Sequence, residues 1–140
     1  QLREKFFGWL EANELNAPNM FAPVATMAAL QQGEEWRRQM LAYVESNVDY
    51  LMEYCQTRVL QVKPLRPQAS YLVWLDCRAL GLTGRQLNDF FVQKVGVALN
   101  EGGTFGPGGD GFMRLNVGTQ RAVLAEALAR LEAAVRNTMP

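Results

Sequence analysis

The chain has 140 residues, 49% of them hydrophobic, and its 14 basic and 14 acidic side chains give a formal net charge of zero. This length and apolar content suit a compact domain with its own core. The balanced charge gives no electrostatic reason to expect nucleic acid or an anionic membrane as a partner, and no apolar run approaches the roughly 20 residues that span a bilayer.

The first third of the chain is predicted to be helical. Residues 2–14 form one helical pattern, and Asn16-Ala17-Pro18-Asn19 interrupts it, with the proline suited to the first turn of a second helix over 20–30. Gly33 ends this second helix. The first helix carries its apolar residues on one side: Leu2, Phe6, Phe7 and Leu10.

The clearest helix runs over residues 34–57, with apolar residues at spacings of three and four. These are Trp36, Met40, Leu41, Val44, Val48, Leu51, Met52 and Cys55. Residues 59–63 then alternate like an edge strand, which Pro64 and Pro67 end or bend. Residues 71–75 (YLVWL) are apolar on both faces, which indicates a central strand covered on both sides and a neighbour beyond this chain.

In the second half, Thr83 to Gln86 reads as a capping box that begins a helix with Leu87, Phe90, Phe91 and Val95 inward. Strands are predicted over 97–100 and 112–117, and Thr119 is expected to cap a final helix. Its inward residues are Leu124, Leu128, Leu131 and Val135. From Glu34 the order is α-β-β-α-β-β-α, which predicts a two-layer α+β sandwich with helices on one face of a small, mostly antiparallel sheet.

Two residue types narrow the chemistry. Histidine is absent, so Ser-His-Asp triads, Cys-His dyads and ordinary zinc sites cannot be built from this chain alone. Cys55 and Cys77 fall in a predicted helix and at the end of a predicted strand, so we expect buried, reduced thiols in a cytoplasmic protein. Carboxylates show no paired acid–base spacing, and we expect no metal site.

The sequence begins at Gln1 in the middle of a predicted helix and shows no signal peptide, which suggests a piece of a longer protein.

Six glycines occur between Gly102 and Gly111, in the loop joining the last two predicted strands. The segment 106–111 matches G-x-G-x-x-G, but a dinucleotide fingerprint needs a helix after it, and here a strand follows. Pro107 also removes one amide donor. Two interpretations remain open: a long flexible hairpin, or a mobile loop that approaches a ligand closely.

Arg114 interrupts the apolar strand after this loop. Because side chains alternate along a strand, Met113, Leu115 and Val117 should face the helices, and Arg114 and its alternate neighbours should face away. Two interpretations are open here as well. Arg114 is either a solvated or salt-bridged surface arginine, or a fixed guanidinium that grips a carboxylate through two hydrogen bonds.

These segments together resemble a known family. The sequences ASYLVWLDCR (69–78), VALNEG (97–102), FG (105–106) and GFMRLN (111–116) are similar to the C-terminal small domain of fold-type I pyridoxal-phosphate (PLP) enzymes. The resemblance is to aminotransferases of class I/II, in the MalY/PatB branch of cystathionine β-lyases, and covers essentially all 140 residues.

The resemblance implies that Arg114 binds the substrate α-carboxylate, with Phe105, Gly106 and Asn116 as further substrate-binding candidates. It implies that the glycine loop borders the active-site cleft and that the parent enzyme is a homodimer, with the segment around 16–19 near the other subunit. Residues 1–32 would be the tail of the large PLP domain and an interdomain segment, and 33–140 the small domain.

The family's Schiff-base lysine, its pyridinium-binding aspartate and its phosphate-binding residues belong to the large domain. Lys5, Lys63 and Lys94 are the only lysines here, and none has the family's Schiff-base context. We therefore expect no catalytic or cofactor-binding residue in this chain. PLP would bind the full-length parent, and the isolated chain would be inactive.

The resemblance thus predicts part of a PLP-dependent carbon–sulfur lyase or aminotransferase acting on an amino acid such as cystathionine. The sequence does not distinguish a lyase from a transaminase. It also does not identify the substrate side chain or the oligomeric state of the isolated domain. A free-standing amino-acid-binding or regulatory α+β module is the alternative, and an interaction scaffold without a ligand is a third possibility.

Overall fold

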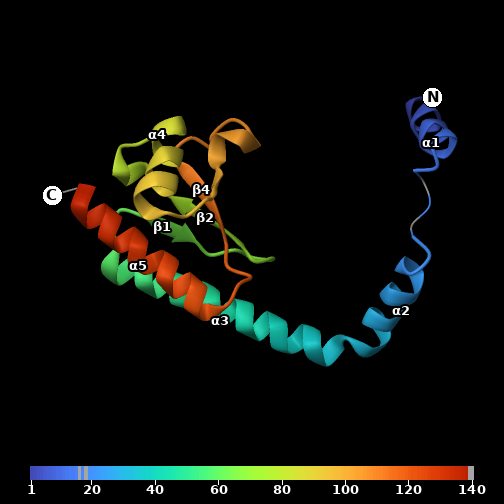
Figure 1. Ribbon diagram of the computed structural model, residues 1–140, viewed down its shortest axis with the longest axis horizontal. Helices are drawn as coiled ribbons and strands as arrows, with labels where there is room; N and C mark the ends of the chain where they lie inside the picture. The colour runs from blue at the N-terminus through green and yellow to red at the C-terminus, as the bar shows by residue number, and fades with distance from the viewer. Residues whose placement is uncertain (16, 18, 139–140) are drawn as a thin grey trace. The chain divides into compact units, whose positions relative to one another are not determined.

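The computed structural model describes residues 1–15, 17 and 19–138, in two compact units, Gln1–Met40 and Leu41–Pro140 (Figure 1). Asn16 and Pro18, in the predicted interruption between the first two helices, lie outside the described residues. The units divide between Met40 and Leu41, within the helix Glu34–Arg58. The predicted domain boundary between residues 32 and 33 stays a prediction.

The first unit consists of helices, as the apolar spacing predicts. Helix α1 spans Leu2–Ala12 and α2 spans Ala22–Gln32, where Gly33 ends it. The Asn19 side chain accepts hydrogen bonds from the backbone N–H groups of Phe21 and Ala22, which satisfies donors at the start of α2. No described residue of this unit is buried, although its helices are rich in large apolar side chains.

Helix α3 (Glu34–Arg58) matches the predicted 34–57 within one residue. In the second unit its buried apolar side chains are Val44, Val48, Leu51 and Cys55, all members of the predicted stripe. Trp36 and Leu41, also in that stripe, are exposed. The burial therefore follows the sequence pattern only from Val44 onward.

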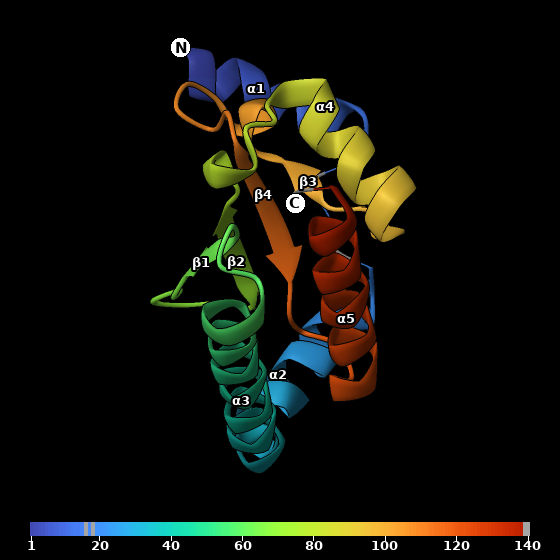
Figure 2. The same cartoon turned by 90° about the vertical axis from the view of Figure 1, so that its left-hand side faces the viewer.

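Four antiparallel strands form the sheet, in the order β1 (Lys63–Leu65), β2 (Leu72–Asp76), β4 (Phe112–Asn116) and β3 (Asn100–Glu101) (Figure 2). The central position of β2 is confirmed. The edge strand predicted over 59–63 is wrong in position, because Val59 is buried before the strand and β1 begins only at Lys63. Pro64 lies within β1 and is tolerated there because an edge strand pairs on one side only.

The strand predicted over 97–100 is also shorter than expected, since only Asn100 and Glu101 pair with β4. Two short 3₁₀ turns, η1 (Arg78–Leu80) and η3 (Gly102–Phe105), follow β2 and β3. The element order from α3 onward and the antiparallel sheet agree with the predicted α+β sandwich.

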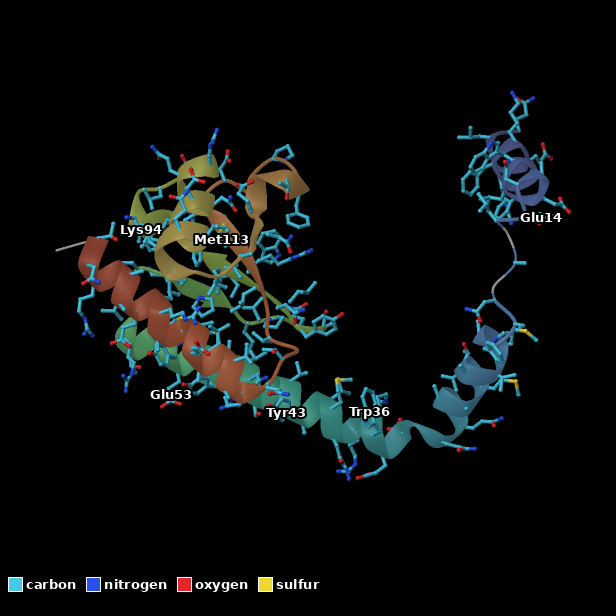
Figure 3. All side chains as sticks on the ribbon, in the orientation of Figure 1. Glu14, Trp36, Tyr43, Glu53, Lys94 and Met113 are labelled. Carbon is cyan, nitrogen blue, oxygen red and sulfur yellow. The ribbon has the colours of Figure 1, made fainter. Side chains whose placement is uncertain are left out.

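The helical layer is completed by α4 (Gly84–Asp89), its π-helical continuation η2 (Phe90–Val95) and α5 (Arg121–Thr138). The eight residues predicted to point inward from these helices are all buried: Leu87, Phe90, Phe91, Val95, Leu124, Leu128, Leu131 and Val135. They meet the sheet face that carries Val73, Leu75, Met113 and Leu115, and Met113 can be located in Figure 3. The core thus lies between one face of the sheet and the helices.

The predicted helix starts need correction. Thr83 precedes α4, but its side chain makes no capping hydrogen bond; Gln86 N–H instead donates to the Thr83 carbonyl at 3.1 Å. Gly84 has φ of 50°, in the left-handed region, so the chain enters the helix by a turn that the capping-box pattern does not describe. Helix α5 begins at Arg121, two residues after the predicted cap Thr119.

A buried polar network joins α3 to the connection between β4 and α5. Asn47, fully buried, donates to the carbonyls of Val117 and Thr119, both at 2.9 Å, and accepts from Arg121 Nε at 2.7 Å. The Arg121 guanidinium also lies over the Tyr50 ring, 4.6 Å from its centroid. Asn47 is the only buried polar side chain of the described core, and these bonds satisfy its amide group. They also hold the segment between β4 and α5 against α3.

Both cysteines are buried free thiols, as predicted, and burial raises the pKa of Cys55 and of Cys77 to about 12. None of the described helices is long and apolar enough to cross a membrane. Within the described residues, no group of three or more acidic or cysteine side chains is placed to hold a metal ion.

Candidate ligand-binding site around Arg114

The sheet face opposite the helices carries one residue from each strand in a single row. Strand pairing places Leu65 of β1 opposite Trp74 of β2, Trp74 opposite Arg114 of β4, and Arg114 opposite Asn100 of β3. Residues directly opposite each other in antiparallel strands point to the same face. The predicted alternation is confirmed, because Met113, Leu115 and Val117 are buried on the other face.

The Arg114 guanidinium is held by a neutral amide and an aromatic ring. Its Nη2 donates to Asn100 Oδ1 at 3.1 Å, and its Cζ lies 4.3 Å from the centroid of the Phe105 ring, a cation–π distance. Arg114 Nε is buried and has no hydrogen-bond partner among the described residues. The guanidinium thus makes one hydrogen bond within the described residues, through Nη2, and a ligand would have to reach its Nη atoms because Nε is buried.

No carboxylate of the described chain pairs with Arg114. The nearby acidic side chains have other partners. Glu101 accepts the Gly103 N–H at 2.9 Å, and Asp76 forms an ion pair with Arg78 at 2.7 Å. The hydrogen bond from Arg78 lowers the pKa of Asp76 below its usual value. The salt-bridged alternative for Arg114 is thus not realised within the described chain.

The glycine loop folds against itself. A Cβ at Gly102 would lie 2.2 Å from the Gly109 carbonyl oxygen, and a Cβ at Gly109 would lie 2.1 Å from the Gly102 oxygen. No other residue fits where two backbone segments pass this closely. At least these two glycines are explained by packing within the loop. Of the two open interpretations, this contact argues against a long flexible hairpin at the base of the loop.

Phe105, at the end of η3, connects this loop to the sheet. Its ring meets Trp74 edge-on, with centroids 5.4 Å apart, while the guanidinium of Arg114 lies over it. Trp74 in turn meets Phe112 edge-on at 6.5 Å. The three rings and Arg114 therefore form one contiguous cluster.

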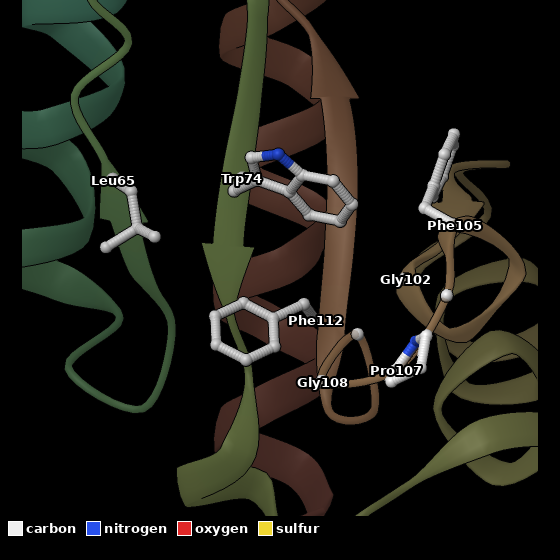
Figure 4. A pocket seen from close by; sticks show the side chains of 9 residues that line it. Leu65, Trp74, Gly102, Phe105, Pro107, Gly108 and Phe112 are labelled. Atoms are coloured by element: carbon white, nitrogen blue, oxygen red, sulfur yellow. The ribbon is translucent and has the colours of Figure 1, made fainter.

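A hollow of about 280 Å³ opens beside this cluster (Figure 4). Leu65, Trp74 and Phe112 line it from the strands, and Phe105, Pro107 and the glycine backbone line it from the loop. Its walls are apolar side chains and loop backbone, and Arg114 lies next to it without lining it. A hollow of this kind beside a guanidinium suits a ligand that has both an anionic group and an apolar part.

The remaining predicted site residues are placed differently. Gly106 lines the hollow and has φ of 119°, a conformation that favours glycine. Asn116 is exposed, and its Oδ1 accepts the Gly118 N–H at 2.8 Å, two residues along the chain. The structure therefore brings Arg114 and Phe105 together, places Gly106 at the adjoining hollow, and engages Asn116 in a local turn.

Sequence reasoning missed Asn100 and Trp74 as neighbours of Arg114. Both lie on segments that the sequence marks as strands, but only the register of β2, β4 and β3 shows that they flank Arg114. An asparagine beside a glycine loop was the one available signal, and it is too common in turns to single out a site.

The three lysines of the chain lie away from the hollow. Lys5, Lys63 and Lys94 are all exposed, on α1, β1 and η2 (Figure 3 labels Lys94), and none lines the hollow. A Schiff-base lysine is kept reactive by a desolvated pocket or a cationic neighbour, which an exposed side chain lacks. Among the described residues, the hollow thus has Arg114 beside it and no lysine in its lining.

Comparison with known proteins gives consistent relatives. No family model matches the chain. It is 40% identical to the cystathionine β-lyase PatB of Bacillus subtilis over 133 residues. The matched region covers 95% of this chain and 34% of PatB. It is 32% identical over 135 residues to the protein MalY of Escherichia coli, covering 96% of this chain and 35% of MalY.

Among solved structures, the chain is similar to a PLP-bound protein of Clostridium difficile 630 that carries the provisional name aminotransferase. The TM-score is 0.86 at 38% identity, over 91% of this chain and 33% of that one. The chain spans about a third of the length of the curated relatives it matches. We conclude that over nearly its whole length the chain is similar to one part of the PLP-dependent enzymes of the MalY/PatB branch, and that this part is their C-terminal small domain.

Proposed function

We propose that the whole protein is a PLP-dependent carbon–sulfur lyase or aminotransferase that acts on an amino acid, and that Arg114 binds the substrate α-carboxylate. The relative PatB is named as a cystathionine β-lyase, and the similar solved structure binds PLP. When bound, PLP supplies an electron sink for bonds broken at the substrate Cα. Its ligands would come from the part of the protein that this chain does not contain.

The observation that carries this proposal is the isolation of Arg114 from the chain's own carboxylates. Among the described residues, eight of the eleven arginines lie within ion-pair distance of a carboxylate, and Arg3, Arg114 and Arg121 do not. Its planar fork can take a carboxylate through two parallel hydrogen bonds. The neighbouring rings exclude water from one side, which strengthens a charge–charge contact there.

The chain's contribution to catalysis would be orientation. Fixing both carboxylate oxygens fixes the position of Cα and leaves only rotation about the bond that joins Cα to the carboxyl carbon, so one further contact to the substrate would define the direction of the bond to be broken. We further propose that the loop from Glu101 to Gly111 borders the cleft and that Phe105 and Gly106 contact substrate, because both lie beside the hollow next to Arg114. Asn116 stays a candidate only, since its amide oxygen already has a backbone partner.

We also propose that residues 1–32 are the tail of the large domain and its link to the small one. Support comes from the described residues of that segment, none of which is buried, because a neighbouring domain would cover their apolar side chains. A homodimeric, cytoplasmic parent is part of the same proposal. The two buried free thiols are compatible with a reducing compartment.

The test is to replace Arg114 by Ala in the full-length protein and measure steady-state kinetics with cystathionine and with amino-acid donors. Loss of one partner of a charged hydrogen-bonded pair should raise KM by about a hundredfold. Arg85→Ala is the matched control, because Arg85 is an exposed arginine on α4 with only a long ion pair to Asp89 at 3.7 Å. An unchanged KM for Arg114→Ala would refute the carboxylate assignment.

A free-standing amino-acid-binding module is the second candidate. It is favoured by one observation, namely that Leu41–Pro140 has its own buried core and presents Arg114 without help from the first unit. An NMR titration of the 140-residue chain with free amino acids distinguishes the two. Saturable shifts at Arg114 and Phe105 in the micromolar range would support the module, whereas a flat titration favours the enzyme domain.

A further inference from the structure

The environment of Arg114 differs in kind from that of most other arginines in this protein. Arg37, Arg78 and Arg130, for example, have their charge neutralised by a glutamate or aspartate. At Arg114 the corresponding contacts are the uncharged amide oxygen of Asn100 and the ring of Phe105. Both orient a guanidinium, and neither cancels its charge.

The orientation of the Asn100 amide follows from its partner. A guanidinium can only donate hydrogen bonds, so the Asn100 oxygen must face Arg114 and the amide nitrogen must point elsewhere. Because Asn100 and Arg114 lie directly opposite each other across β3 and β4, the register of the two strands places their side chains next to each other. Their hydrogen bond holds one nitrogen of the fork in place.

Phe105 restrains the plane of the same group. The ring is itself kept in place by its edge contact with Trp74 and by the crossing of Gly102 and Gly109 at the base of the loop. The glycine crossing therefore acts on Arg114 through Phe105. A long, flexible arginine side chain is thus held at two points of its charged end.

We propose that Asn100 and Phe105 are positioning residues, which hold the Arg114 guanidinium in one orientation and leave its positive charge free for a substrate carboxylate. The proposal rests on the function proposed above. It makes a neutral residue at position 100 essential: an acidic side chain of the same size would reach the guanidinium equally well and would compete with the substrate from within the protein.

The test is a series in the full-length protein with KM and kcat measured separately. Asn100→Ala removes a hydrogen bond to a charged group and should raise KM about tenfold. Asn100→Asp keeps the size but adds a charge, and should raise KM more than Asn100→Ala does. Phe105→Leu keeps an apolar contact and loses the ring face, and should raise KM about threefold. In each case kcat at saturating substrate should change by less than the change in KM.

A structural role alone would give the reverse order, because the isosteric Asn100→Asp would then be milder than Asn100→Ala. That order would overturn the proposal, as would wild-type KM for both Asn100 variants. Thermal unfolding of each variant shows whether the domain remains folded. If Arg114→Ala leaves KM unchanged, the proposed function fails. If Arg114→Ala raises KM while the Asn100 variants do not, the function stands and only the positioning role fails.

Discussion

The two units of the chain use similar apolar helices to opposite effect. In Leu41–Pro140 the apolar faces of α3, α4, η2 and α5 close over one side of the sheet. In Gln1–Met40 every large apolar side chain described is at least partly exposed; Phe7 is 52% and Leu30 is 80% exposed. Amphipathic pattern alone therefore does not show whether a helix has its partner within the same chain.

The largest effect expected from this comparison is on stability. Leu51→Ala removes a fully buried side chain from the core and should lower the free energy of unfolding by about 2–5 kcal/mol. The same change at Leu30, in the first unit, should stay within about 0.5 kcal/mol. Urea denaturation of the 140-residue chain measures both. Equal losses for the two variants would show that the first unit has a core of its own.

A second effect concerns pH. Burial raises the pKa of Cys55 and Cys77 to about 12, above the value of about 8.5 for an unfolded thiol. The folded state therefore keeps these protons longer. Their contribution to the free energy of unfolding is complete below about pH 8.5 and is lost as the pH rises toward 12.

This loss should be visible in denaturation midpoints measured between pH 8 and pH 10.5, and should shrink in the double variant Cys55→Ala, Cys77→Ala. Both thiols should also react slowly with a thiol reagent at pH 8 until the second unit is unfolded. Rapid modification of the native chain would contradict the buried positions.

A small effect is also expected when residues 1–40 are deleted. Because the core residues of the second unit all lie beyond Met40, the shortened chain should keep its urea midpoint, with a change in the free energy of unfolding below about 1 kcal/mol. A midpoint that falls markedly would show that the first unit stabilises the second. In that case the two-unit comparison would have to be abandoned.

Much of the fold could be predicted from local patterns. Spacing of three and four gave α3 and the buried residues of α5, and alternation over five residues placed Arg114 on the face without helices. These predictions succeeded because each depends on residues within one element. The limits of the strands were harder to predict. Val59 is buried before β1 begins, and Lys63 is the first residue that pairs with β2, so the start of β1 depends on where β2 lies and not on the local sequence.

The site could be predicted only in part for the same reason. Arg114 itself is conspicuous in an apolar strand, but its partner Asn100 lies 14 residues earlier in the chain and is identified only by the register of β3 against β4. The contact between Gly102 and Gly109 is likewise a matter of backbone path, so the sequence could not tell a packed loop from a flexible one.

The buried amide of Asn47 has a consequence for Arg114 as well. By binding the carbonyls of Val117 and Thr119, it fixes where β4 leaves the sheet. If β4 slipped by one residue against β2, every side chain of the strand would change faces, and the arginine would enter the core while Met113 turned outward. Asn47 would then lose its carbonyl partners in the same step, so a single asparagine on α3 penalises the misfolded pairing that would abolish the site.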